Sequence, residues 1–368
     1  MRVLHIFNEL KFSGAEIMYV DAANIFQEKG CELTAMATGT NIGEYSTYFE
    51  NAGYTVIHKP MPAIRNYFKR IVYYKNITKY LKENAYDVVH IHSSAARWGF
   101  AFCAWLANVK SVYTFHNVFK SRKITYPYHY LLRWSAKNIF KCSFHTISDS
   151  VFENELKYYF NKTNKIYNWY GDHRYYPSSV GEKLATRIEL DIDEEAFVLI
   201  SVGGCSPVKR HSDIIKALPI ILKKHPNALY LHLGKGISEN AEMKLAQELG
   251  VSEHILFCGN VTNVRTYLIA ADIYLMPSKF EGIPITTIET MATGIPCILY
   301  DVPGLRDFNK DAKTAILIEE DFTILAQEVI DLHGDTKKIQ AITQSALLNV
   351  ANLYNMKKNA LNIFNLYH

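Results

Sequence analysis

The segment 278–298, SKFEGIPITTIETMATGIPCI, contains two glutamates whose spacing suits a sugar or nucleotide ligand. It follows an apolar run at 273–276, turns at Gly282 and has Pro284 at a position typical of the first turn of a helix. Glu281 then lies in the loop, and Glu289 lies eight residues later inside the helix. A carboxylate can accept two hydrogen bonds from a vicinal diol such as that of a ribose. The alternative is that Glu281 is a solvated loop charge and Glu289 a helix-surface residue.

A second candidate is the segment 202–211, VGGCSPVKRH, which combines a strand end, two glycines and two adjacent cations. Backbone N–H groups of a glycine turn and of a helix N-terminus form an anion site, and here Gly203 and Gly204 supply the turn. Lys209 or Arg210 would supply the opposing charge. This is neither a Walker loop nor a complete GxGxxG motif, so a basic surface turn is the alternative interpretation.

The first half of the chain offers a glycine and a histidine at comparable places. Gly14, in FSGAE, opens the first long helical pattern directly after the first strand, where the helix dipole favours a negatively charged ligand. His116, in TFHN, stands at the carboxyl end of the strand expected at 111–115. In open α/β sheets ligands bind at the carboxyl ends of the strands, so both positions are candidates for a binding site. The alternatives are a plain tight turn and a buried structural histidine.

The residue types that bind metals are present without metal-binding spacing. The six cysteines are widely separated with no CxxC pair, which predicts free thiols rather than a zinc site or a disulfide framework. His90 and His92 point to the same face of a strand, but two ligands without a third do not make a metal site. Asp191 and Asp193 resemble a DxD motif, yet they precede a strand and suit a solvated turn. We therefore expect no metal and no resident cofactor.

Short apolar runs alternate with amphipathic helical patterns along the chain, which is typical of βαβ units and parallel sheets. The expected strands are 3–7, 32–37, 88–91, 111–115 and 143–147, followed by 196–202, 229–233, 255–257, 273–276, 297–300 and 315–318. Helical patterns at 15–29 and 67–83 separate strands of the first series. The predicted fold class is α/β with two Rossmann-like, doubly wound domains. The boundaries are 1–172, completed by a C-terminal helix at 352–368, and 173–351.

Charge is unevenly divided along the 368 residues. Residues 1–170 hold 21 Lys and Arg against 12 Asp and Glu, whereas the remainder holds 19 against 24. Within the basic half, residues 61–82 interleave cations with aromatic side chains in a helical pattern, which suits either an anionic membrane surface or an ordinary solvated helix face. No nucleic-acid recognition module accompanies this charge. The N-terminal segment has no long apolar region and no run is long enough to span a membrane, so we expect a cytoplasmic protein, with peripheral contact at the inner face of the membrane as one interpretation of the basic helix.

Taken together, these segments resemble the retaining glycosyltransferases of family 4, also called group 1, which have the GT-B fold. The resemblance spans nearly the whole chain and is strongest over 198–304. Its most specific element is the E-x7-E signature, here Glu281 and Glu289. The SGAE turn, the glycine turn before Lys209, the ADIYLMPS segment and the C-terminal helix follow in the family's order.

The resemblance implies roles for the matching residues. Glu289 would bind the ribose hydroxyls, and Lys209, helped by the Gly14 amide, would neutralise the diphosphate. His116 would lie against the donor sugar near the reacting carbon. Glu281 would hold the donor sugar together with the backbone of four residues, Gly282, Ile283, Pro284 and Ile285.

Two positions depart from the family pattern. An arginine often follows the first glycine of the second domain's turn, and this chain has Gly204 there, so that a phosphate-binding cation is missing unless Arg210 replaces it. The paired glycines of the first turn are Ser13 and Gly14 here. The diphosphate contacts are therefore the part of the family pattern that this sequence reproduces least.

The function implied is retaining transfer of a hexose-type sugar from a nucleotide donor, expected to be UDP-linked, to a lipid-linked or polysaccharide glycan. A small soluble acceptor is a variant of the same activity. The alternative from another class is a non-catalytic GT-B subunit that binds a nucleotide-sugar or a partner transferase.

Overall fold

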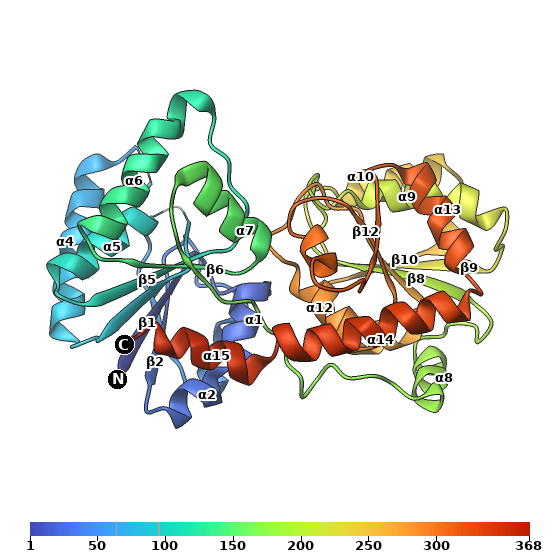
Figure 1. Cartoon of the computed structure of the whole chain (residues 1–368), viewed down its shortest axis with the longest axis horizontal. Helices are drawn as coiled ribbons and strands as arrows, with labels where there is room; N and C mark the ends of the chain where they lie inside the picture. Colours follow the sequence, from blue (N-terminus) through green and yellow to red (C-terminus); the bar gives the residue numbers. More distant parts are fainter. Residues whose placement is uncertain (64, 95) are drawn as a thin grey trace. The chain divides into compact units, whose positions relative to one another are not determined.

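The computed structural model describes residues 1–63, 65–94 and 96–368 and divides the chain into two compact units. The first unit comprises Met1–Trp169 and Met356–His368, and the second comprises Tyr170–Asn355. The boundaries expected from the sequence were 172/173 and 351/352. Figure 1 shows both units coloured along the sequence.

The first unit is built on a seven-stranded parallel sheet in the order β3-β2-β1-β4-β5-β6-β7. Its strands are β1 (Arg2–Phe7), β2 (Glu32–Ala37), β3 (Thr55–His58), β4 (Val88–Ile91), β5 (Lys110–Phe115), β6 (Ser143–Thr146) and β7 (Asn164–Lys165). All four residues of β4 are buried, as expected for a central parallel strand covered on both faces. The apolar runs of the sequence therefore become the middle of this sheet.

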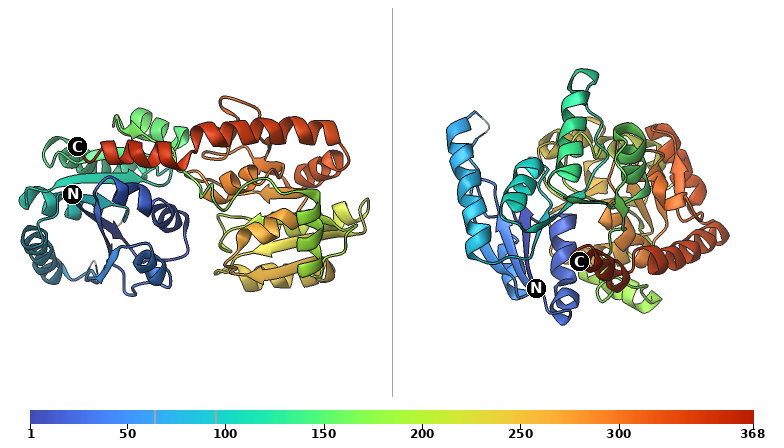
Figure 2. Two further views of the ribbon diagram at one scale, coloured as in Figure 1. Left: turned by 90° about the horizontal axis from the view of Figure 1, so that it is seen from below. Right: turned by 60° about the vertical axis from the view of Figure 1, so that its left-hand side comes forward.

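Helices cover both faces of this sheet, as the further views in Figure 2 show. The helices are α1 (Gly14–Asp21), α2 (Ala23–Glu28), α3 (Ser46–Asn51), α4 (Tyr67–Glu83), α5 (Arg97–Leu106), α6 (Tyr126–Asn138), α7 (Asp149–Glu153) and α15 (Met356–Asn365), with short turns η1 (Lys123–Thr125) and η2 (Asn154–Tyr158). The helices α4, α5 and α6 lie side by side on one face, and α15 lies beside α2 on the other. The C-terminal helix thus completes the first unit, where the Tyr367 hydroxyl lies 2.7 Å from His90 Nδ1.

The second unit has a six-stranded parallel sheet in the order β10-β9-β8-β11-β12-β13. The strands are β8 (Phe197–Val202), β9 (Ala228–Leu233), β10 (Ile255–Gly259), β11 (Ile273–Met276), β12 (Cys297–Tyr300) and β13 (Ile316–Ile318). The helices are α8 (Val180–Glu189), α9 (His211–Leu222), α10 (Glu239–Glu248), α11 (Val264–Ala270), α12 (Ile285–Ala292), α13 (Phe322–Leu332) and α14 (Thr336–Leu353), with short turns η3 (Ser252–His254) and η4 (Arg306–Asn309). On one face α9 contacts α10 and α13, and on the other α12 contacts α14 and α8 contacts α11. Two Rossmann-like α/β units result, as the sequence predicted.

Three local features differ from the sequence prediction. Strands β3 and β7 were not predicted, because β3 is only partly buried and β7 has two residues, so neither leaves a strong apolar pattern. The helix expected at 15–29 is broken at Ala22. The Tyr54 hydroxyl and the Trp169 indole donate hydrogen bonds to the carbonyls of Tyr19 and Met18, so tertiary partners use the acceptors of the last turn of α1.

None of the helices in the described part of the chain is both long and apolar enough to cross a membrane.

Candidate functional site

The glycine turn of the second unit follows β8 and is tightly packed. A Cβ at Gly234, where φ is +128°, would lie 2.1 Å from the carbonyl oxygen of Gly203, so only glycine allows the turns after β8 and β9 to approach this closely. The Lys209 side chain crosses the same turn, because a Cβ at Gly203 would lie 3.1 Å from Lys209 Cε. The turn therefore places a cation directly over exposed backbone at the carboxyl end of the sheet, where α/β proteins bind ligands.

Lys209 and Glu281, which lie 72 residues apart in the sequence, meet at this place. Lys209 Nζ donates a hydrogen bond of 2.8 Å to Glu281 Oε1, and both side chains are partly exposed. A hydrogen bond holds the backbone of Glu281 in place, because its N–H donates to the Pro303 carbonyl at 2.9 Å. The chain at Gly304 can pass this close to Glu281 because it has no side chain: a Cβ at Gly304 would lie 2.3 Å from the Glu281 carbonyl oxygen. A positioned ammonium and a positioned carboxylate thus share one site, accessible to a ligand.

Glu289 is the fifth of the eight residues of α12 and is 5% exposed. Pro284 is the residue before the helix rather than part of its first turn, so the predicted start was one residue early. The loop residues Gly282, Ile283 and Pro284 and the first helical residue, Ile285, are buried. The connection between β11 and α12 is therefore packed into the unit, with Glu281 before it and Glu289 inside the helix that follows.

Arg210 adopts a left-handed conformation with φ of +54° and turns away to other partners. Its guanidinium pairs with Asp213 at 2.7 Å and with Glu320 at 2.6 Å, and it stacks over the Tyr300 ring. Two carboxylates therefore neutralise Arg210 in this arrangement. Arg210 therefore does not replace the arginine that the family often has at the position of Gly204.

Lys235 is a residue that the sequence reasoning missed. It follows β9 in the sequence GKG, and its side chain lies against Gly259, where a Cβ would be 2.7 Å from Lys235 Cε. Its carbonyl oxygen would lie 3.4 Å from a Cβ at Gly204, and within the described ranges Lys235 forms no ion pair. The signal in the sequence was a cation between two glycines at the end of a strand.

In the first unit His116 follows β5 and takes part in a chain of imidazoles. His92 Nδ1 lies 3.3 Å from His116 Nε2, and His5 Nδ1 lies 3.1 Å from His92 Nε2. Burial lowers the pKa of His116 to about 3 and holds that of His92 well below its usual range. These histidines are therefore neutral at physiological pH.

The predicted His90–His92 pair gains a third imidazole from His5 on β1. Both ring nitrogens of His90 are already hydrogen-bonded, Nδ1 with the Tyr367 hydroxyl and Nε2 with the Thr114 hydroxyl, each at 2.7 Å. The ring nitrogens of His90 are thus already used inside the core, whereas His5 Nε2 is buried without a hydrogen-bond partner.

Gly14 is the first residue of α1, and the turn before it holds a buried acid. The Ser13 hydroxyl donates a hydrogen bond to the carboxylate of Glu16, which lies in the first turn of the helix. Burial raises the pKa of Glu16 to about 7. The sequence placed Gly14 correctly at a helix N-terminus, but it gave no sign that a substantial fraction of the neighbouring Glu16 carboxyl is protonated near neutrality.

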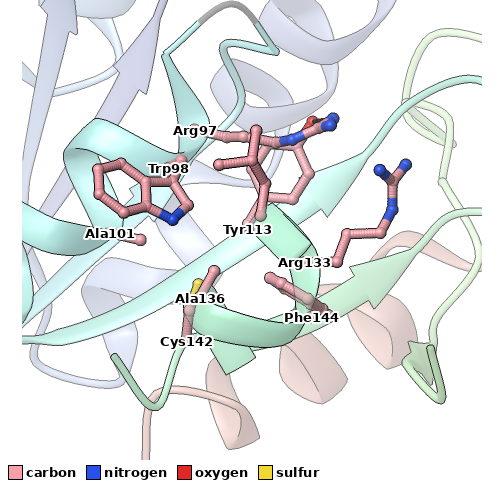
Figure 3. A pocket seen from close by; sticks show the side chains of 9 residues that line it. Arg97, Trp98, Ala101, Tyr113, Arg133, Ala136, Cys142 and Phe144 are labelled. Atoms are coloured by element: carbon pink, nitrogen blue, oxygen red, sulfur yellow. Dashed lines mark hydrogen bonds between the residues drawn. The ribbon is translucent and has the colours of Figure 1, made fainter. Parts of the chain in front are cut away.

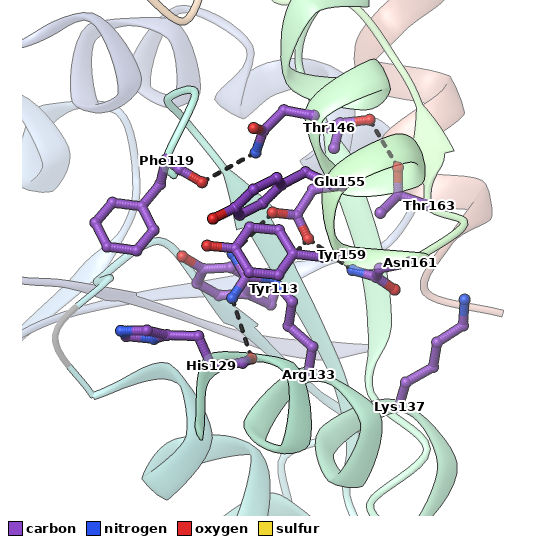
Figure 4. A network of polar contacts seen from close by, with 12 residues as sticks. Tyr113, Phe119, His129, Arg133, Lys137, Thr146, Glu155, Tyr159, Asn161 and Thr163 are labelled. Atoms are coloured by element: carbon purple, nitrogen blue, oxygen red, sulfur yellow. Dashed lines mark hydrogen bonds and ion pairs between the residues drawn. The ribbon is translucent and has the colours of Figure 1, made fainter. Parts of the chain in front are cut away.

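A small pocket of the first unit lies between α5 and α6 and holds none of the predicted site residues (Figure 3). Its lining is largely apolar and aromatic and includes two arginines, Arg97 and Arg133. The guanidinium of Arg133 donates two hydrogen bonds of 2.8 Å to Glu155, stacks over Tyr159, and belongs to the polar network of Figure 4. This cation is fully neutralised inside the protein.

Two family models match nearly the whole chain between them. The model described as Glycosyltransferase Family 4 matches residues 12–168, and the model described as Glycosyl transferases group 1 matches residues 182–347. The second match contains Lys209, Lys235, Glu281 and Glu289, and the first contains Gly14 and His116.

Similar sequences and structures are also glycosyltransferases or related synthases by their names, or bind UDP and glucose. The chain is 25% identical over 302 residues to a UDP-Gal:alpha-D-GlcNAc-diphosphoundecaprenol alpha-1,3-galactosyltransferase of Escherichia coli, covering 79% of this chain and 78% of the relative. It is 26% identical over 301 residues to an alpha-monoglucosyldiacylglycerol synthase of Acholeplasma laidlawii, covering 76% and 74%. Among solved structures, Anabaena Alr3699/HepE in complex with UDP and glucose is similar with a TM-score of 0.84 at 18% identity, covering 99% and 98% of the two chains.

Proposed function

The chain belongs to the glycosyltransferases of family 4, also called group 1, and from this premise we propose that it transfers a hexose-type sugar from UDP to a lipid-linked or polysaccharide glycan with retention of configuration. The observation that carries the proposal is the Lys209–Glu281 pair beside the glycine turn of the second unit. It supplies a cation for a diphosphate and a carboxylate for sugar hydroxyls at the carboxyl end of one sheet.

In the proposed complex the ammonium of Lys209 contacts the diphosphate and the carboxylate of Glu281 accepts hydrogen bonds from the sugar. The mutual ion pair keeps both side chains in place before the donor arrives, which reduces the reorganisation that binding requires. Glu289 accepts hydrogen bonds from the ribose hydroxyls of the nucleotide, and the backbone of Gly282 to Ile285 holds the donor sugar. Because Arg210 is paired with Asp213 and Glu320, we assign the second phosphate-binding cation to Lys235 instead.

The proposed reaction is a front-face substitution. The acceptor hydroxyl oxygen forms a bond to the anomeric carbon from the face that the diphosphate leaves, and the bond from that carbon to the phosphate oxygen breaks. The acceptor proton passes to an oxygen of the departing phosphate. Negative charge grows on the diphosphate in the transition state, and Lys209 and the backbone amides stabilise it electrostatically. His116 contributes a neutral imidazole against the sugar, and Gly14 contributes an amide for the phosphate.

We further propose that Lys209, Lys235 and the amides take the place of a divalent ion in this reaction. The rate should then not depend on added Mg²⁺ or Mn²⁺.

A lipid-linked acceptor is supported by the charge and exposed surface of the first unit. Residues 61–142 contain 14 Lys and Arg but two Asp and Glu. Three neighbouring helices of this region, α4 to α6, expose large apolar side chains, namely Tyr67, Phe68, Ile71, Val72, Trp105, Leu106, Tyr128, Leu131 and Trp134. Cations near an anionic membrane contribute about 1 kcal/mol each, and aromatic side chains suit its interface. We therefore propose that this face docks peripherally on the membrane that carries the acceptor.

The activity is tested with the purified full chain in three steps. A thermal-shift panel of UDP-, GDP- and ADP-sugars identifies the donor, since a ligand at about 100 times its dissociation constant stabilises by about 2.7 kcal/mol. Transfer of a labelled sugar to an extract of bacterial lipids then gives an organic-soluble product, and NMR gives its anomeric configuration. Glu281→Ala should abolish transfer while UDP binding persists.

Three other outcomes would each contradict one part of the proposed function. An inverted product would contradict the front-face reaction. Transfer to small soluble acceptors alone would remove the lipid-linked class. UDP-sugar binding with neither hydrolysis nor transfer would favour a non-catalytic subunit, which the glycine at position 204 motivates.

Membrane docking is tested by flotation with anionic vesicles. Tyr67→Ser together with Phe68→Ser should reduce the floating fraction, because both side chains are highly exposed on α4. Ile188→Ser on α8 of the second unit is the matched control, since Ile188 is equally exposed but lies in the other unit. Equal flotation of all three proteins would contradict the docking face.

A further inference from the structure

Four side chains that bind metals in other proteins meet in the interior of the second unit. Cys205 lies in the loop after β8, His211 begins α9, His232 lies on β9 and Glu242 lies on α10. All four are buried. They come from four different elements, so the cluster is a product of the fold.

The distances between their ligand atoms suit one small cation. His232 Nε2 lies 3.0 Å from Glu242 Oε2, His211 Nδ1 lies 3.7 Å from the same oxygen, and Cys205 Sγ lies 3.9 Å from His232 Nε2. All four ligand atoms lie within 4.8 Å of one another. Ligands at the usual zinc bond lengths of about 2.0–2.3 Å lie about 3.5 Å apart in a tetrahedron.

Hydrogen bonds inside the protein satisfy the cluster only in part, since the Cys205 thiol donates to the Gly234 carbonyl at 3.3 Å and His232 Nε2 lies 3.0 Å from Glu242 Oε2. His211 Nδ1 is buried and has no hydrogen-bond partner, although it is directed at the group. Glu242 forms no ion pair with any lysine or arginine of the described residues, and its close partners are the two imidazoles. A buried carboxylate without a cation is costly. An imidazole nitrogen without a hydrogen-bond partner beside a buried carboxylate that no lysine or arginine pairs with suits a bound cation.

We propose that Cys205, His211, His232 and Glu242 bind a Zn²⁺ ion. A thiolate and a carboxylate balance its two positive charges, two neutral imidazoles complete a tetrahedral shell, and the thiol proton is released to solvent on binding. The mixture of sulfur, nitrogen and oxygen donors favours zinc over magnesium or calcium. Four protein ligands leave no open position, so the ion is structural and takes no part in the sugar transfer.

The site would stabilise the turn to which the diphosphate contacts are assigned. Cys205 directly follows Gly203 and Gly204, its N–H donates to the Lys235 carbonyl at 3.2 Å, and its own carbonyl accepts from Ser238 at 3.3 Å. An ion at this cluster would join the turn after β8 to β9, α9 and α10 through side chains, in addition to the backbone hydrogen bonds between that turn and the turn after β9. It would thereby hold Lys235 and the glycine turn in register.

The test is metal binding by the full chain, measured without any activity assay. Protein purified from zinc-supplemented cells is expected to contain equimolar zinc by elemental analysis. After chelation, titration with Co²⁺ should give the intense visible bands of tetrahedral cobalt together with a thiolate-to-cobalt charge-transfer band, and Zn²⁺ should displace them.

Cys205→Ser should lose the charge-transfer band and should be purified with far less than equimolar zinc, because it lacks the thiolate ligand. Cys258→Ser is the matched control, because Cys258 is a partly buried thiol on β10 outside the cluster. Circular dichroism and a cooperative thermal unfolding transition verify that each variant is folded. Chelation should lower the melting temperature of the wild type and of Cys258→Ser and leave that of Cys205→Ser unchanged.

Two results would overturn the proposal. Wild-type protein that takes up no equimolar zinc or cobalt would show that the four residues form a hydrogen-bonded core cluster, and this result does not depend on any variant folding. Equal metal content in the wild type and in folded Cys205→Ser would show adventitious binding elsewhere. Neither result bears on the sugar transfer proposed above, which is assayed separately.

Discussion

Each unit contains a prominent ion pair, and the two pairs differ in burial and in saturation. In the first unit Arg133 and Glu155 are 2% and 1% exposed, and Glu155 accepts two hydrogen bonds from the guanidinium and one from Asn161. In the second unit Lys209 and Glu281 are 21% and 13% exposed and share a single hydrogen bond. Each side-chain nitrogen of Arg133 and both carboxylate oxygens of Glu155 already have a partner inside the protein, whereas the second pair keeps donors and acceptors for a ligand. Burial, rather than residue type, thus separates an ion pair that maintains the fold from one suited to catalysis.

The largest expected effect concerns the buried pair. Glu155→Ala leaves the Arg133 cation buried and unpaired, so the free energy of unfolding in urea should fall by about 3–5 kcal/mol. Glu153→Ala, which removes the exposed pair with Lys157, should change it by less than about 1 kcal/mol. Equal effects of the two substitutions would remove the distinction based on burial.

The next effect concerns catalysis at the exposed pair. Lys209→Ala should lower kcat/KM for the UDP-sugar by about 10²–10³, because it removes a cation that faces the developing charge. Lys216→Ala, on the exposed face of α9, is the control and should leave the rate unchanged. A decrease below about threefold for Lys209→Ala would contradict the role assigned to the pair.

Glu16 gives a pH-dependent effect of slightly smaller size. Its pKa is raised by burial to about 7 in the folded protein, above the ordinary value of 4.5, so the folded state binds the proton more tightly than the unfolded state. Its contribution to stability is therefore present at low pH and is lost as the pH rises from about 4.5 through 7.

Glu16→Gln removes this titration. The variant should match the wild type near pH 4.5 and exceed it by up to about 3 kcal/mol above pH 7, measured by urea unfolding at each pH. Parallel stability curves for the two proteins would show that Glu16 keeps an ordinary pKa.

The smallest expected effect sharpens the assignment of the second cation. Lys235→Ala should lower kcat/KM by about tenfold, whereas Arg210→Ala, whose guanidinium is already neutralised, should change it by less than about threefold. A larger loss of kcat/KM for Arg210→Ala than for Lys235→Ala in steady-state kinetics would assign the second phosphate-binding cation to Arg210.

Much of the architecture was predictable from the sequence, because buried parallel strands are continuous apolar runs and the helices between them are amphipathic. Strands β4, β11 and β12 have the bounds that the pattern indicated. The break at Ala22 was not indicated by the local pattern, and the last turn of α1 there accepts hydrogen bonds from Tyr54 and Trp169, which lie far away in the chain.

The sequence by itself determined the two α/β units, the family and the placement of Lys209, Glu281 and His116 next to strand ends, because these depend on local periodicity and on the order of motifs. Only the tertiary structure decided which side chains meet. In the structure Lys209 forms an ion pair with Glu281, and Arg210 forms one with Glu320. The tertiary structure also brings together the four side chains of Cys205, His211, His232 and Glu242. The physical reason is that contacts between distant residues are set by how the strands are ordered and how the helices are packed on them, and spacing along the chain does not encode these directly.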